Sequence, residues 1–153
     1  MSCIFLFFLL LFLYLIFYKE GFRSNKTIDI CSEDPEKITG YMRDGKCSLN
    51  KRDKGTHTVC GEVTQKFLEF SRDRGNNLIQ PNESFPGLED GDKWCLCAKR
   101  WEEALICAED NSCLDLNPED VPKINRDATH IKTLKLVPQL KKPEIRRRYI
   151  KDI

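Results

Sequence analysis

The chain has 153 residues, and its 25 basic and 24 acidic side chains leave a formal net charge of +1. This balance excludes a strong overall electrostatic field for nucleic acid, so we expect no nucleic-acid partner. The length allows one domain with a modest core and excludes two comfortable ones.

The first predicted element is an apolar N-terminal helix. Residues 3–18 are all apolar or aromatic, with no charge, Gly or Pro. A helix over residues 1–18 would be about 27 Å long, which is close to the hydrocarbon thickness of a thin bilayer. The basic n-region and small-residue cleavage site of a signal peptide are missing. We therefore predict one uncleaved N-terminal transmembrane helix over residues 1–18, with a cleaved signal peptide as the alternative.

The charges that follow this helix predict its orientation. Lys19, Arg23 and Lys26 lie on its C-terminal side, and no basic side chain precedes it. The positive-inside rule then places the rest of the chain in the cytosol. Glycosylation sequons at residues 25–27 and 82–84 would fit a lumenal domain instead. We expect a single-pass membrane protein whose domain faces the cytosol, with the membrane as its partner and no protein partner indicated.

Composition divides the remaining chain into three parts. Residues 19–28 are predicted to be a polar linker, and residues 29–140 a cysteine-rich domain. Residues 141–153 form a basic tail, either a solvated terminus or a segment that lies on anionic lipid. Within the domain, residues 41–45 predict a short strand that closes in an Asp-Gly turn.

The clearest helix of the domain is predicted over residues 63–75. Thr64 is a good N-cap residue, and Val63 and Leu68 have the spacing of a hydrophobic staple. Gly75 can adopt the left-handed conformation that ends a helix.

Further elements follow in a loop-rich chain. Residues 80–93 contain several Pro and Gly residues and predict an irregular loop. A second helix is predicted over residues 98–109, because its apolar residues recur with helical spacing: Trp101, Ala104, Leu105 and Ala108. Residues 127–129 resemble a turn, and residues 134–137 form a short apolar segment. Together these elements predict a small, single, loop-rich α+β domain.

Eight cysteines are many for this length. Cys3 lies in the apolar helix, so the domain holds the other seven: Cys31, Cys47, Cys60, Cys95, Cys97, Cys107 and Cys113. Seven is odd, so a fully paired disulfide framework leaves one cysteine over. In a reducing compartment the same residues would be thiols or metal ligands.

One subset of these residues suggests a metal site. Cys47, His57, Cys60, Cys95 and Cys97 offer the sulfur and nitrogen ligands that tetrahedral zinc prefers. The C-x-C spacing of Cys95 and Cys97 differs from the C-x₂₋₄-C pairs usual in structural zinc sites. Disulfide or redox pairing, and inert packing of buried thiols, stay open as alternatives.

A thiol nucleophile is another hypothesis for this region. Cys60 near His57 or His130, with Asp44 as the orienting carboxylate, would make a Cys/His/Asp arrangement. The sequence contains no G-x-S-x-G, G-x-G-x-x-G, P-loop or H-E-x-x-H motif. Whether the protein is an enzyme therefore stays open.

Several strings occur together in an order that resembles a known family. They are GYMRDGKC at 40–47, HTVC at 57–60, FLEFS at 67–71, RGNNL at 74–78, FPGL at 85–88, GDKWCLCA at 91–98, RW at 100–101 and ATH at 128–130. The combination is similar to domain-of-unknown-function family 2237, a mostly bacterial family of uncharacterised proteins, over roughly residues 29–140.

The resemblance implies a shared fold and a shared pocket around His57, Cys60, Cys95, Cys97 and His130. It implies no activity. The N-terminal apolar helix and the basic tail depart from the usual form of the family. So does Lys46, because family members typically carry two adjacent cysteines at positions 46 and 47.

These observations lead to a ranked set of functional expectations. The first is a membrane-anchored, thiol-rich binding or structural module that can hold zinc. The second is a disulfide-stabilised domain facing a lumen or a particle exterior. The third is a thiol-dependent enzyme.

Overall fold

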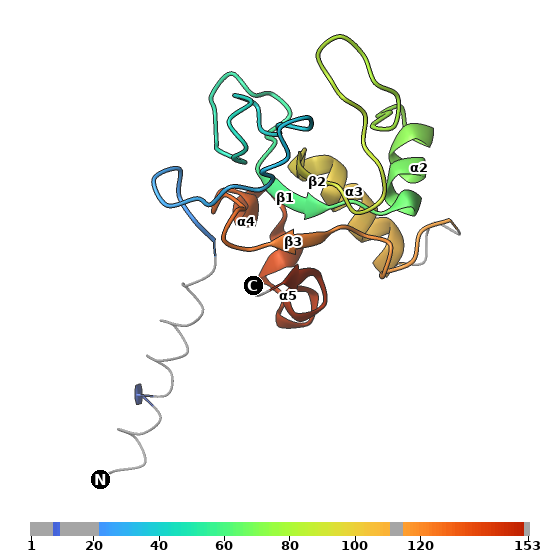
Figure 1. Cartoon of the computed structure of the whole chain (residues 1–153). Coiled ribbons are helices and arrows are strands. Elements are labelled where there is room, and N and C mark those ends of the chain that lie inside the picture. Colours follow the sequence, from blue (N-terminus) through green and yellow to red (C-terminus); the bar gives the residue numbers. More distant parts are fainter. Residues whose placement is uncertain (1–7, 10–21, 111–114, 152–153) are drawn as a thin grey trace.

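The computed structural model describes residues 8–9, 22–110 and 115–151 and has an α+β fold (Figure 1). Within these residues a four-stranded sheet is combined with short helices. The strands are β1 (Val59–Glu62), β2 (Lys93–Leu96), β3 (Lys123–Asn125) and β4 (Ile150–Lys151). The helices are α2 (Gln65–Asp73), α3 (Ala98–Glu109), α4 (Thr133–Leu136), α5 (Pro143–Tyr149) and the 3-10 helix η1 (Pro138–Lys141).

The sheet is mixed, with the strand order β2-β1-β3-β4. Strand β1 pairs antiparallel with both β2 and β3, and β3 pairs parallel with β4. In the β1–β2 ladder Val59 lies opposite Leu96, and Cys60 lies opposite Cys95. Because side chains alternate along a strand, these two cross-strand pairs face opposite sides of the sheet.

Helix α2 forms where the sequence predicted it. Thr64 is its N-cap, and the Thr64 hydroxyl accepts a hydrogen bond from the Phe67 backbone N–H at 3.1 Å. Phe67 and Leu68 are fully buried on its inner face. Gly75, with a φ of +78°, follows the helix in the left-handed region that Gly tolerates.

Helix α3 confirms the predicted range of residues 98–109. The apolar stripe of this helix is buried in the main core. Trp101 is fully buried in this core, and its indole N–H donates to the carbonyl of Pro122 at 2.9 Å. Burial of this large ring and a satisfied donor fix α3 against the chain that leads into β3.

The chain before β1 and the chain after β3 differ from the sequence-based expectations. Residues 41–45 form turns and not a strand, because the Asp44 carboxylate accepts from the Lys46 backbone N–H at 3.1 Å and keeps the chain folded back locally. The segment predicted as a basic tail instead supplies α5 and β4 to the fold. Figure 1 shows the blue and cyan loops before β1 gathered on the side of the sheet away from α2.

The predicted transmembrane helix over residues 1–18 lies outside the described residues, except for Phe8 and Leu9, which are helical. In the part of the chain that the structure describes, no helix is both long enough and apolar enough to cross a membrane.

Candidate functional site

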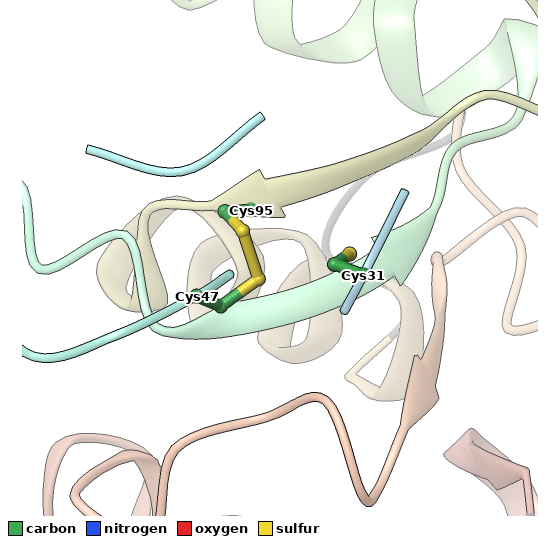
Figure 2. A group of neighbouring side chains, drawn as sticks. All are labelled: Cys31, Cys47 and Cys95. Atoms are coloured by element: carbon green, nitrogen blue, oxygen red, sulfur yellow. A yellow bond between two sulfur atoms is a disulfide. The ribbon is translucent and has the colours of Figure 1, made fainter. Parts of the chain in front are cut away.

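Two disulfides fasten the loops before β1 to the sheet. Cys31 is bonded to Cys60 of β1, with their Cα atoms 5.6 Å apart. Cys47 is bonded to Cys95 of β2, with their Cα atoms 5.1 Å apart (Figure 2). All four side chains are at most 3 % exposed. Since Cys60 and Cys95 face each other across the strands, the two disulfides lie next to one another.

The sulfurs form one compact cluster. The Sγ atoms of Cys31, Cys47 and Cys95 all lie within 4.8 Å of one another. Ile28 and Ala128 complete a small apolar core around the four cysteines, separate from the main core. Val59 and Leu96 point into the main core. Because side chains alternate along β1 and β2, Cys60 and Cys95 lie on the opposite face of the sheet.

The structure brings together three members of the sequence-based metal set. Cys47, Cys60 and Cys95 lie in the cluster, and their sulfurs are in disulfides, so they are not in the thiolate form that binds metal. Cys97 is a free, half-buried thiol at the N-cap of α3. Cys31, which belonged to no predicted site, supplies the remaining sulfur of the cluster.

His57, the last member of that set, is held by a carboxylate. Its Nδ1 atom is 2.7 Å from Oδ1 of Asp53, and its backbone N–H donates to Oδ2 of the same residue at 2.7 Å. The Asp53 side chain is almost fully buried, whereas the His57 side chain is 40 % exposed. The partner of His57 is therefore Asp53 and not the Asp44 of the nucleophile hypothesis. Asp53 and His57 are four residues apart in the sequence, and this spacing was the signal for their pairing that the sequence-based hypothesis did not use.

His57 and Cys95 also line a pocket of about 340 Å³. Its other walls come from the loop after residue 39, from the loop between α2 and β2, and from β2: Gly40, Tyr41, Arg43, Leu78, Phe85 and Trp94. The pocket thus adjoins the sulfur cluster, because Cys95 belongs to both. Of the pocket that the family resemblance implied, His57 and Cys95 are in this lining, while Cys60 lies in the sulfur cluster.

The pocket combines aromatic surface with a cation. The Phe85 and Trp94 rings meet edge to face with their centroids 5.3 Å apart. The Arg43 guanidinium lies over Trp94, 5.1 Å from the ring centroid, at a distance that gives a cation–π attraction. Two of its nitrogens donate to the carbonyls of Ile38 and Ser84 at 3.2 and 2.7 Å. These bonds fix Arg43 at the pocket wall.

His130 lies in the chain after β3 and is hydrogen-bonded to the residue just before β1. Its backbone N–H donates to the carbonyl of Thr58 at 3.0 Å, and Nδ1 accepts from the Lys132 backbone N–H at 3.0 Å. Burial lowers the pKa of His130, and the nearby charge of Lys132 lowers it further. The imidazole is therefore a neutral structural acceptor at neutral pH.

This geometry defines a small α+β domain whose central strand pair carries two neighbouring disulfides beside an aromatic pocket. A family model described as an uncharacterized protein conserved in bacteria, DUF2237, matches residues 24–143. The chain therefore belongs to the DUF2237 family. No curated protein matches the chain.

Proposed function

We propose that the domain is a binding module whose pocket takes a small ligand that has an aromatic part and an anionic group. Three aromatic side chains, Tyr41, Phe85 and Trp94, line the cavity together with Arg43. A cavity of about 340 Å³ falls in the range of small-molecule sites.

The charge of Arg43 carries the proposal. A guanidinium has five N–H donors, and two carbonyl contacts leave others for a ligand. Within residues 22–110 and 115–151, no carboxylate lies within ion-pair distance of Arg43. An anionic group is the chemistry that such an uncompensated, fixed guanidinium favours.

The disulfide framework gives this pocket its shape. The Cys47–Cys95 bond ties the loop that carries Gly40 and Arg43 to the strand that carries Trp94. Gly40 has a φ of +91°, and a Cβ there would lie 2.5 Å from the carbonyl oxygen of Lys46. Rigid walls reduce the ordering cost of binding, which supports a binding role for a disulfide-tied domain.

Benzoate, titrated into the full chain in mild detergent, tests the proposal, with benzyl alcohol as the uncharged control. We expect benzoate to bind more tightly and to shift the indole N–H resonance of Trp94. Replacing Arg43 by Gln should weaken benzoate binding about tenfold or more, because a hydrogen bond to a charged group is worth about 1.5–3 kcal/mol. Replacing the exposed Arg72 by Gln is the matched control. Equal affinity for the two probes, or no effect of Arg43→Gln, would reject the proposal.

The compartment of the protein stays a separate proposal. Two buried disulfides favour an oxidising environment for the crosslinked form, such as a lumen or a particle exterior. The basic residues after the predicted anchor favour the cytosol instead. The N-terminal membrane anchor itself rests on the sequence of residues 1–18 alone.

A further inference from the structure

The four cysteines of the two neighbouring disulfides offer the number and type of ligands that a tetrahedral metal site needs. Around a zinc ion bound at about 2.3 Å, four thiolate sulfurs lie about 3.8 Å from one another. The sulfurs of Cys31, Cys47 and Cys95 already lie within 4.8 Å of one another. The fourth sulfur, on Cys60, is bonded to that of Cys31 and comes from the residue opposite Cys95 (Figure 2 shows the other three).

We propose that this cluster binds one Zn²⁺ through Cys31, Cys47, Cys60 and Cys95 when both disulfides are reduced. The same four residues then crosslink the domain in two exclusive ways, by disulfides when oxidised and by zinc when reduced. The two forms exclude each other because a sulfur in a disulfide has no thiolate to donate to a metal. This inference goes beyond the pocket and does not depend on ligand binding there.

Each chemical step balances with a thiol or phosphine reductant supplied from outside. A phosphine and one water convert each disulfide into two thiols, and the phosphine becomes its oxide. Four thiols then bind Zn²⁺ as thiolates and release four protons. Oxidation by a disulfide of the surroundings, such as oxidised glutathione, removes four electrons from the four thiolates, restores both protein disulfides and releases the zinc.

The backbone keeps the four residues in place without the disulfide bonds. Cys60 and Cys95 lie in the β1–β2 ladder. The Cys31 backbone N–H donates to the carbonyl of Gly45 at 2.7 Å. Cys47 forms an isolated bridge with Thr129. Each ligand thus has a main-chain support of its own, and the metal needs only modest side-chain movement.

The geometry favours this ligand set over the one expected from sequence. The His57 imidazole is hydrogen-bonded to the Asp53 carboxylate and lies in the pocket wall. Cys97 lies beyond the end of β2, at the start of α3. Its thiol is free and belongs to neither disulfide. Cys31 replaces both as a ligand because it is already bonded to Cys60.

The test uses the full chain in mild detergent, reduced with a phosphine under anaerobic conditions and titrated with Co²⁺ as a spectroscopic probe. We expect one Co²⁺ per chain with the visible absorption of tetrahedral thiolate coordination, displaced by one Zn²⁺. The oxidised chain should show no such spectrum. Single Cys→Ser changes at positions 31, 47, 60 and 95 should each lower the Co²⁺ affinity at least tenfold and change the spectrum.

Two variants serve as matched controls, Cys97→Ser and His57→Ala. Both should bind Co²⁺ as the unmodified chain does, and near-ultraviolet circular dichroism of all reduced variants checks that the core around Trp101 is intact. The proposal is overturned if the folded reduced chain gives no tetrahedral thiolate spectrum. It is also overturned if Cys31→Ser binds normally, or if either control loses binding. Benzoate binding to the oxidised chain is measured separately, so the two proposals can fail independently.

Discussion

His130 is a buried histidine that the fold keeps neutral. Its side chain is enclosed, and its Nδ1 atom accepts the Lys132 backbone N–H. Protonation would place a hydrogen on Nδ1. The Nδ1–H and the Lys132 backbone N–H would then be two donors facing each other. The pKa of His130 lies below its ordinary value of 6.5 because burial and then Lys132 disfavour the charged form.

The sign of the resulting pH dependence follows from proton linkage. The unfolded chain takes up this proton at a higher pH than the folded chain does, so acid favours unfolding. The contribution of His130 to stability is complete above pH 6.5 and is lost as the pH falls from there toward the pKa of the folded state. His130→Asn keeps an acceptor but does not titrate.

We therefore expect the free energy of unfolding of His130→Asn to fall less than that of the unmodified chain between pH 7 and pH 5. Urea unfolding followed by tryptophan fluorescence measures both curves. Because the two proteins share every other titratable group, the difference between their curves isolates His130. Parallel curves would show that this imidazole titrates alike in the folded and unfolded states.

The pairing of the cysteines shows what single residues cannot reveal in a sequence. Cys31 and Cys60 are 29 positions apart, and Cys47 and Cys95 are 48 apart. Which sulfurs meet depends on how loops fold onto strands, and no local pattern encodes that. The sequence placed Cys60 and Cys95 in one site because His57 and Cys97 lie within three residues of them, and it added Cys47, which lies ten residues before His57. Cys31 has no such neighbour and was missed.

The two longer helices were predicted well because their signals are local. Thr64 and Gly75 bracket α2 within a few residues, and the apolar period of α3 runs through the whole helix. The strands escaped prediction because each is at most four residues long. A strand this short shows little alternation, and its pairing partners lie far away in the chain.

The N-cap of α2 can be tested directly. The Thr64 hydroxyl accepts from the Phe67 N–H and also donates to the carbonyl of Asp120. Thr64→Ala removes both bonds, so we expect a loss of about 1–2 kcal/mol in the free energy of unfolding. Thr64→Ser keeps the hydroxyl and should cost much less. Urea denaturation compares them, and equal losses would mean that the methyl group of Thr64, not its hydroxyl, stabilises the helix.

The C-terminal segment connects distant parts of the molecule. β4 pairs with β3 at the sheet edge, and α5 places Ile145 and Tyr149 on one buried face. The Tyr149 ring meets Trp101 edge to face, with centroids 5.9 Å apart, and its hydroxyl donates to Glu109 of α3. The run of Arg residues at 146–148 obscured this in the sequence, because a basic terminus is usually solvated. Buried positions four apart were the signal for a packed helix.

If α5 closes the main core, Tyr149→Ala should lower the free energy of unfolding by about 3–5 kcal/mol, the cost typical of a large buried aromatic. Tyr149→Phe keeps the ring and loses only the bond to Glu109, so about 1 kcal/mol is expected. Arg147→Ala, at an exposed position of the same helix, should change stability by no more than about 0.5 kcal/mol. Denaturant unfolding monitored by tryptophan fluorescence ranks the three variants. A tyrosine-to-alanine change as mild as the arginine change would mean that the domain ends before α5, as its composition first suggested.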